Sequence, residues 1–425
     1  MDDGVLARID AIKILRRWMD TDEFPDRMMG GVPPFRRGFV MDLVYTTLRN
    51  VRALDFVLEP LIQREPQEHA MPALLLGACQ ILKMPDVAEH AAVHATVEAL
   101  KTLDGEHVTG FANAVLRNIL RNLDSIKQDL ENAPIAVRES HPDEQVERWE
   151  KRFGKERTAA ICAWDNLPAS VTVVTVPQGP SVPELIQSFA TVGVTAEPHP
   201  GAADYAIIVP HGSHVEELPG FGTGAFSIQD PATTEAVRLL DVKPDLRVLD
   251  ACAAPGGKSV QIGLRLQGAG LLVSMDCWRD RLPPLEENLA RFRLLPLAKV
   301  IHGDARRITV NDLDGRKFDR ILLDVPCSNT GVQRRRADSR WRFSAERLQT
   351  LNETQLMILE NASELLAPGG RIVYSTCSLE EEENEGIISE FIRRHPKFQI
   401  VDKVFIVPPE KQMDGAFAAA LENKW

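Results

Sequence analysis

The stretch Asp250-Ala-Cys-Ala-Ala-Pro-Gly-Gly-Lys-Ser259 decides the fold of this chain. It follows an apolar segment, residues 247–251, that is predicted to be a strand, and it leads into a predicted helix. Glycines in such a turn let the backbone approach a ligand closely, and the first N–H groups of the following helix are free to bind one. A strand, a glycine turn and a helix in this order are typical of an open α/β sheet with a ligand site at its edge.

The pattern continues on both sides of this turn as alternating strands and helices. The further predicted strands are residues 271–275, 299–302, 318–323 and 371–374, and the clearest helices between them are 281–292 and 345–366. Pro368-Gly369-Gly370 predicts a helix stop followed by a tight turn. Residues 225–425 are therefore expected to form an α/β domain with a doubly wound, mostly parallel, Rossmann-like sheet.

Two further domains are expected before residue 225. Residues 1–140 show apolar residues at helical spacing in 6–15, 40–48, 74–82, 90–100 and 111–123, which predicts an all-α bundle of five or more helices. Residues 141–224 read as a small α+β module, with helices at 143–164 and 182–190, strands at 171–176 and 205–209, and a glycine-rich connector at 220–224.

Composition excludes several classes of protein. The chain has 425 residues, 49 basic and 61 acidic, with a net charge of -12, which argues against coating nucleic acid or membrane through bulk positive charge. The longest apolar run, 70–79, is about half the length that spans a bilayer. Asp2 and Asp3 do not suit a secretory signal. The acidic run 380–383 with Glu385 is interpreted as a solvated or helix-capping turn.

The cysteines favour a reduced, cytoplasmic protein without zinc. Six cysteines are too sparse for a disulfide scaffold, and none form a C-x-x-C pair. We expect no metal site. Cys79, Cys162, Cys252 and Cys277 are interpreted as packing residues.

Polar or reactive residues stand at the ends of five successive strands. These ends are Asp250, Asp276, Gly303-Asp304, Asp324-Val-Pro-Cys-Ser328 and Ser375-Thr-Cys-Ser378. Asp276 lies twenty residues after Gly256, the spacing at which a carboxylate can bind ribose hydroxyls. The carboxyl ends of parallel strands lie at one edge of a sheet. The polar residues at these five ends therefore predict a nucleoside-type cofactor at that edge, with two cysteines beside it.

Two other cofactor classes fit the turn less well. A nicotinamide enzyme would have G-x-G-x-x-G, which the residues 253–258 lack. A phosphate-binding P-loop would have a glycine where Cys252 stands, although Gly257-Lys258-Ser259 matches its end. The turn is therefore interpreted as an S-adenosylmethionine site.

The motifs 250–259, Asp324-Val-Pro-Cys-Ser-Asn-Thr-Gly331 and Tyr374-Ser-Thr-Cys-Ser-Leu379 together resemble the signature set of RNA cytosine-5 methyltransferases. Gln229-Asp230-Pro231 resembles the entry segment of that family. The helical N-terminus, including Phe111-Ala-Asn-Ala-Val-Leu-Arg117, is similar to the NusB-like domain of the bacterial Sun/RsmB subgroup, which methylates cytosine in 16S ribosomal RNA. The resemblance implies a NusB-like RNA-binding domain in 1–140, a linker or RNA-binding module in 141–224 and a methyltransferase domain in 225–425.

The resemblance also assigns roles to residues. Cys377 would be the nucleophile, Cys327 would assist product release, and Asp324 would contact the cytosine. The cofactor would lie against Cys252, Ala253, Ala254, Pro255, Gly256, Gly257, Lys258, Asp276 (ribose), Asp304 (adenine) and Asp324. Arg281 would orient this site, although an exposed helix arginine explains it equally well.

A basic segment follows the Cys327 motif and is expected to contact RNA. It contains Arg334, Arg335, Arg336, Arg340, Trp341 and Arg342. The arginines would attract phosphates and the tryptophan would stack, while a base is flipped into the pocket. An exposed basic loop without a ligand is the alternative.

The expected substrate is 16S ribosomal RNA, free or in an early assembly state, and the expected protein is a monomer. A transfer-RNA cytosine-C5 methyltransferase and a non-catalytic RNA-binding or antitermination factor remain alternatives. The chain departs from the family in the strand 171–176, which lacks the Leu-Arg-x-Asn pattern, at Ala337 in place of a common proline, and at Asp414-Gly-Ala-Phe417. These departures concern RNA contacts rather than the predicted chemistry.

Overall fold

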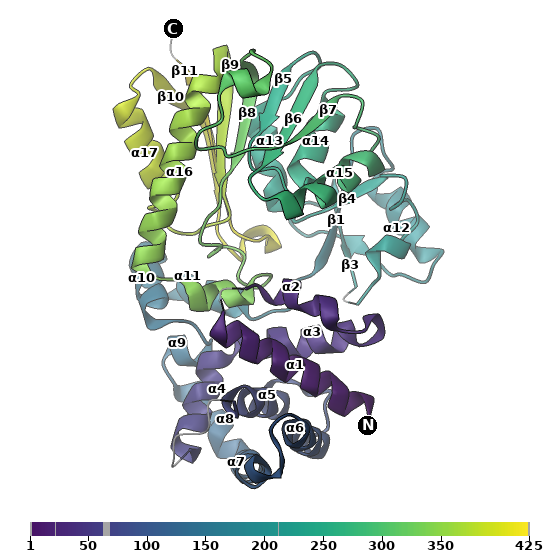
Figure 1. Ribbon diagram of the computed structural model, residues 1–425, viewed down its shortest axis with the longest axis vertical. Coiled ribbons are helices and arrows are strands. Elements are labelled where there is room, and N and C mark those ends of the chain that lie inside the picture. Colours follow the sequence, from purple (N-terminus) through teal and green to yellow (C-terminus); the bar gives the residue numbers. More distant parts are fainter. Residues whose placement is uncertain (1, 22, 63–68, 211, 424–425) are drawn as a thin grey trace. The chain divides into compact units, whose positions relative to one another are not determined.

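A computed structural model describes residues 2–21, 23–62, 69–210 and 212–423 (Figure 1). The chain divides into two compact units. The first comprises Met1–Pro168 and the later segment Gln333–Arg342, and the second comprises Ala169–Val332 and Phe343–Trp425. Each unit is described by itself.

The first unit is a helical bundle, as predicted. Its helices are α1 (Asp3–Asp20), α2 (Pro25–Met28), α3 (Pro34–Arg49), α4 (Val51–Leu58), α5 (Met71–Lys83), α6 (Glu89–Asp104), α7 (Thr109–Arg121), α8 (Leu123–Asn132), α9 (Ile135–Arg138), α10 (Asp143–Phe153) and α11 (Lys155–Asp165). Helix α5 is buried on almost every side, from Pro72 to Ile81, and α1, α3, α6 and α7 supply apolar residues to the same core. A helix that is apolar all round is stable only when neighbouring helices cover it.

The expected helix over 143–164 is two helices. Gly154, with φ at 82°, separates α10 from α11, because a left-handed glycine ends a helix without steric cost. Both helices belong to the first unit, which therefore continues to Pro168 and passes the boundary expected at residue 140.

Arg340 ties the segment Gln333–Arg342 into the helical unit. Its guanidinium is fully buried and donates to the carbonyl oxygens of Arg49 and Ser140 at 2.9 Å, to Asn166 Oδ1 at 2.9 Å and to the carbonyl oxygen of Asp165 at 3.1 Å. Buried carbonyl groups require hydrogen-bond donors, and here the Arg340 side chain supplies them to three separate segments, at residues 49, 140 and 165–166. The helical unit is thus completed by residues that follow it in the chain by more than a hundred positions.

We predict that Arg340→Ala destabilises the protein strongly, because it leaves four acceptors, two of them fully buried, without their donor. The expected loss is about 3 kcal/mol or more of unfolding free energy. Arg336→Ala is the matched control, because Arg336 pairs with Asp26 at the surface and should cost under about 1 kcal/mol. Denaturant titration measures both, and equal losses in the two variants would contradict the structural role of Arg340.

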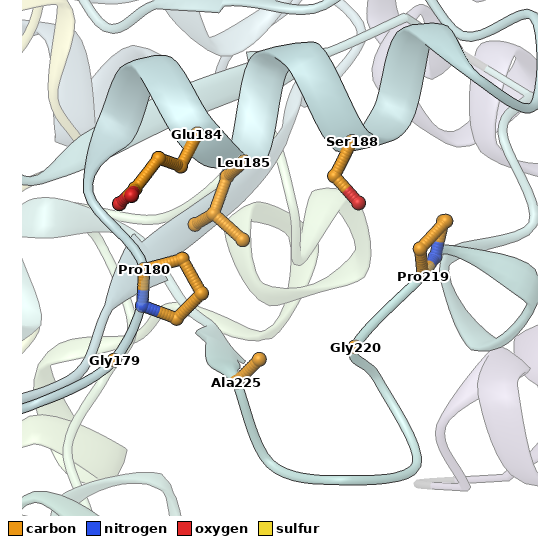
Figure 2. Close-up of a pocket in the computed structure, with 8 residues that line it drawn as sticks. All are labelled: Gly179, Pro180, Glu184, Leu185, Ser188, Pro219, Gly220 and Ala225. Atoms are coloured by element: carbon orange, nitrogen blue, oxygen red, sulfur yellow. The ribbon is translucent and has the colours of Figure 1, made fainter.

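The second unit begins with a small antiparallel sheet. Its strands β1 (Val171–Thr175), β2 (Glu197–Pro198), β3 (Ala206–Val209) and β4 (Phe226–Ile228) lie in the order β2-β3-β1-β4, and helix α12 (Val182–Ala190) packs on them. Figure 2 shows a hollow between α12 and the glycine-rich connector. The Glu184 carboxylate in its wall accepts hydrogen bonds from Ser181 and caps α12.

The large sheet has the order β10-β11-β9-β8-β5-β6-β7. Its strands are β5 (Arg247–Asp250), β6 (Leu271–Asp276), β7 (Ala298–His302), β8 (Phe318–Asp324), β9 (Leu366–Thr376), β10 (Phe398–Ile406) and β11 (Ala416–Asn423), and its helices are α13 (Thr234–Leu240), α14 (Gly257–Arg265), α15 (Leu282–Arg291), α16 (Ala345–Leu365) and α17 (Glu385–Arg394). Strands β5 to β9 pair in parallel, while β10 and β11 form an antiparallel hairpin at one edge.

Helices cover both faces of the large sheet, and alternate side chains of each strand pack against the two layers of helices. Val248 and Leu322 face a core that includes α13, α14 and α15, whereas Leu249 and Ile321 face a core that includes α16 and α17. Successive side chains of a strand point to opposite faces, so strands buried on both sides need apolar residues throughout. The expected α/β architecture is confirmed.

Two details differ from the expectations. The hairpin β10–β11 was not among the predicted strands. Residues 368–370 do follow the end of α16, but they lie within β9 at a register shift opposite β8 rather than in a turn before the strand. Gly369 takes a φ of 73° there. Within the part of the chain that the structure describes, no helix is both long enough and apolar enough to cross a membrane.

Candidate active site

Cys327 and Cys377 meet because β8 and β9 are neighbouring parallel strands. Asp324 pairs with Ser375 across the two strands. Cys327 lies three residues after Asp324, and Cys377 lies two residues after Ser375. The two Sγ atoms lie 3.2 Å apart. Positions fifty residues apart in the sequence thus form one pair of thiols, as expected.

The backbone around the pair is held by small residues. Cys377 Sγ lies 3.1 Å from Asn329 Oδ1, and Asn329 donates to the carbonyl oxygen of Cys327 at 3.2 Å. Gly331 N–H donates to the carbonyl oxygen of Cys377 at 2.9 Å, and a Cβ at Gly331 would stand 2.8 Å from that oxygen. The same Cβ at Gly331 would also stand 2.8 Å from the Cα atom of Gly415. Sequence reasoning assigned no role to these glycines, although both stood inside motifs that it quoted.

The environment of Cys327 favours its protonated form. The hydrogen bond with Cys377, together with burial, raises the pKa of the Cys327 thiol well above its ordinary value. Cys327 therefore keeps its proton at neutral pH and can donate it toward Cys377.

Lys258 and Asp324 form an ion pair beside the cysteines. Lys258 Nζ lies 2.7 Å from Asp324 Oδ2. Burial opposes the charge of Lys258, but the attraction and hydrogen bond of Asp324 raise its pKa above the ordinary value. Lys258 was expected against the cofactor, and the structure shows that its ammonium group reaches the carboxylate of Asp324 at the end of β8.

The glycine turn has the geometry of a ligand cradle. Gly256 takes a φ of 108°, and α14 begins at Gly257. A Cβ at Gly257 would stand 3.3 Å from Gln229 Oε1, and Gln229 Nε2 is buried without a hydrogen-bond partner among the described residues. The bare backbone and an unpaired amide suit a polar ligand. Cys252, Ala253, Ala254 and Pro255 form the turn before it, where Ala254 N–H donates to Asp276 Oδ2 at 3.2 Å.

The other expected cofactor residues lie at neighbouring strand ends. Asp276 is the last residue of β6, is buried, and accepts a hydrogen bond from Trp278 N–H at 2.9 Å. Asp304 follows β7, and hydrogen bonds from Arg306 lower its pKa, so it stays ionised. Arg281 is exposed on the turn before α15. The structure thus brings Asp276 and the glycine turn together, whereas Asp304 is engaged by Arg306.

The remaining cysteines divide into two groups. Cys79 and Cys162 are buried in the helical unit, and burial raises the pKa of Cys79 to about 12, as suits packing residues. Cys252 packs against the sheet core beside the glycine turn. Cys277 was expected to be a packing residue, but it is exposed after β6.

The basic segment after the Cys327 motif differs from the expectation of an RNA-contacting loop. Arg340 is buried, and Arg334 is buried with its guanidinium 3.9 Å from the ring centre of Trp164. Trp341 donates its indole N–H to the carbonyl oxygen of Leu48 at 2.7 Å, and Arg342 donates to that of Glu23 at 2.6 Å. These side chains are committed to the helical unit, because buried guanidinium groups require fixed partners. Arg336 is exposed and Arg335 is half-buried.

The acidic run is only in part the solvated or helix-capping turn that was expected, with Glu385 in the first turn of α17. Glu381 and Glu382 are exposed, as a solvated turn requires, but Glu380 and Glu383 are buried. The Glu383 carboxylate accepts hydrogen bonds from Ser328 and Ser378, the residues that directly follow the two cysteines.

Asp250 generates a pH-dependent prediction. Burial, opposed by a hydrogen bond from Ser259, raises the pKa of Asp250 to about 7. An unfolded chain loses this proton near pH 4, so the contribution of Asp250 to stability falls as pH rises from about 4 to about 7. Asp250→Asn carries no titrating proton, so we predict that it gains unfolding free energy relative to the natural protein over this interval.

Chemical denaturation at pH 4.5 to 8 measures that difference. The exposed Asp245→Asn is the control for removing one carboxylate. A difference between Asp250→Asn and the natural protein that stays constant with pH would contradict a buried, protonated Asp250.

Solved structures with the same fold include two proteins that cover much of this chain. PH0851 superposes with a TM-score of 0.80 at 21% identity, over 99% of this chain and 98% of its own. NSun6 from Pyrococcus horikoshii superposes with a TM-score of 0.59 at 23% identity, over 66% of this chain and 98% of its own. These similarities establish the fold.

Sequence comparison establishes the family. Residues 237–422 match the family model of the 16S rRNA methyltransferase RsmB/F, and residues 6–121 match the NusB family. The ribosomal RNA small subunit methyltransferase B of Vibrio cholerae is 32% identical over 92% of this chain and 91% of its own length. That of Pseudomonas putida is 33% identical over 86% and 83%. With these relatives and both family models in the expected order, the chain belongs to the ribosomal RNA small subunit methyltransferase B family.

Proposed function

We propose that this protein transfers a methyl group from S-adenosylmethionine to C5 of a cytosine in 16S ribosomal RNA, by covalent addition of Cys377 to C6. The single observation that carries this proposal is the pair of thiols 3.2 Å apart, beside the Lys258–Asp324 ion pair, at the edge of a methyltransferase sheet. The relatives' activity on small-subunit ribosomal RNA supports the substrate class.

The residues present fit S-adenosylmethionine. The glycine turn, the start of α14 and the unpaired Gln229 amide suit the methionine end, and Asp276 suits the ribose hydroxyls. Asp304 would meet the adenine amino group once Arg306 yields one of its hydrogen bonds. NSun6 was solved with SFG, an analogue of this cofactor. When bound, the cofactor supplies an electrophilic methyl group.

The chain's own residues would make the cytosine reactive. C5 of cytosine is a weak nucleophile, and addition of the Cys377 thiolate to C6 converts the ring to an enamine. Asp324, held by Lys258, would bind the cytosine edge and favour protonation of N3 as the S–C6 bond forms. After the C5–methyl bond has formed, water would take the C5 proton, and the electron pair of the C5–H bond would expel the Cys377 thiolate from C6. N3 would then release its added proton to solvent, which restores the aromatic ring. Cys327, 3.2 Å from the leaving sulfur, would assist this elimination.

The helical unit is proposed to recognise RNA. Arg336, which is exposed and pairs with Asp26 at the surface, and the half-buried Arg335 are its candidates for phosphate contact from the basic segment. Arg334 and Arg340 are buried, and Trp341 and Arg342 donate to backbone carbonyl groups of the unit. Loss of a phosphate contact weakens RNA binding and lowers its dependence on salt.

We predict that Cys377→Ala abolishes methyl transfer, because it removes the thiol that is proposed to add to C6. Transfer of label from methyl-labelled S-adenosylmethionine to 16S ribosomal RNA measures this, with transfer RNA as a second substrate. Cys162→Ala, a buried cysteine of the helical unit, is the control and should retain activity. Full activity of Cys377→Ala would exclude the proposed nucleophile.

We also predict that Cys327→Ala accumulates a covalent protein–RNA adduct, because attack by Cys377 proceeds while elimination is blocked. A band of low mobility on a denaturing gel reports the adduct, and Cys327→Ala combined with Cys377→Ala should show none. Normal turnover by Cys327→Ala without such a band would assign the release step to another group.

A further inference from the structure

One buried carboxylate joins the two loops that carry the cysteines. Glu383 is fully buried, and it accepts hydrogen bonds from Ser328 N–H at 2.9 Å, from Gln355 Nε2 at 2.9 Å and from the hydroxyl groups of Ser328 and Ser378. An ionised carboxylate can accept about four such bonds. All of its acceptor capacity is therefore used, and no cation is needed to satisfy it.

The donors are the immediate neighbours of the thiols. Ser328 follows Cys327 on the β8 loop, and Ser378 follows Cys377 on the β9 loop. Gln355 of α16, which donates to Glu383, also donates to the carbonyl oxygen of Pro326 at 2.9 Å, on the other side of Cys327. The carboxylate thus fixes the backbone next to both sulfur atoms at once.

Glu383 is itself held in place. Tyr374 donates its hydroxyl to the carbonyl oxygen of Glu383 at 2.6 Å. Asn384 accepts from Thr376 Oγ1 at 2.5 Å and donates to the carbonyl oxygen of Ser378 at 2.8 Å. The segment 378–384 is closed onto the end of β9 by these bonds, so the carboxylate has little freedom to move.

We propose that Glu383 is a positioning residue that sets the distance and orientation of the Cys327–Cys377 pair. This rests on the proposed function, because it concerns the two thiols of that reaction. A buried carboxylate is an unfavourable way to stabilise a fold, since its desolvation costs several kcal/mol that a neutral residue would avoid. Four bonds directed at two loops are better explained by the geometry that they impose on the thiols.

The charge of Glu383 also acts on the thiols. After the hydrogen bond with Cys377 and burial, the negative charge of Glu383 further raises the pKa of Cys327. Among the described residues, the other charged or titrating groups near the pair are Lys258, which interacts with Cys377, its partner Asp324, and Tyr374, whose phenol interacts with Cys327. Glu383 would thereby keep Cys327 protonated while Cys377 attacks.

Two substitutions separate geometry from charge. Glu383→Gln keeps an acceptor for Ser328 N–H and Gln355 but removes the charge, whereas Glu383→Ala removes every bond. Glu381→Gln, an exposed glutamate of the same acidic run, is the matched control. For each full-length variant we would measure the denaturation midpoint, the pH dependence of Cys327 alkylation by iodoacetamide under reducing conditions, and kcat and KM for methyl transfer.

The expected results differ among the variants. Glu383→Ala should lower kcat on the order of 100-fold, the cost of misplacing reacting groups by about 1 Å, with little change in the KM of the cofactor. Glu383→Gln should recover kcat to within about tenfold of the natural enzyme. Its Cys327 alkylation curve, followed by mass spectrometry without RNA or cofactor, should move to lower pH, whereas Glu381→Gln should match the natural protein throughout.

The positioning role is overturned if Glu383→Gln and Glu381→Gln give the same alkylation curve, or if Glu383→Gln is as slow as Glu383→Ala at an unchanged denaturation midpoint. Failure of the proposed function looks different. In that case the natural protein methylates no RNA, while the shift in the Cys327 alkylation curve still supports the contact between Glu383 and the thiol pair.

Discussion

Parallel pairing of β8 with β9 is the constraint on which the site depends. Because Asp324 lies opposite Ser375, the two strands end at the same edge of the sheet, and the loops that follow them meet there. A shift of the register by one residue would move the start of one loop, and with it one cysteine, along the edge of the sheet relative to the other. The large cores on both faces of the sheet therefore do more than stabilise the fold, since they fix the register that brings the two sulfur atoms together.

Polar groups then refine what the sheet provides. Bare backbone at Gly331 lets the β8 loop lie against the carbonyl oxygen of Cys377, and the Glu383 carboxylate accepts hydrogen bonds from both loops. Lys258 brings a positive charge from the cofactor turn to Asp324. The glycine turn and the end of β8 are thus connected by one ion pair, which couples the position of Asp324, the proposed cytosine contact, to the start of α14.

Sequence reasoning predicted the features that depend on local pattern. Apolar runs followed by polar turns identified the five parallel strands and the convergence of Cys327 with Cys377. It missed features that depend on burial between distant segments. Arg340 has the sequence context of an exposed basic loop, and Glu383 that of a solvated acidic turn, because nothing in the adjacent residues reveals the carbonyl groups or serine hydroxyls that they meet. The hairpin β10–β11 was missed for a related reason, because β10 is largely exposed and lacks a continuous apolar run.

The identity of the attacking atom is tested most directly with RNA that carries 5-fluorocytosine. Fluorine at C5 cannot leave as a cation, so the reaction stops after methyl transfer with the cysteine still bound to C6. Digestion and mass spectrometry of the trapped complex should locate the nucleotide on the peptide that contains Cys377. A nucleotide attached to Cys327, or methylation of RNA without any trapped complex, would contradict covalent catalysis by Cys377.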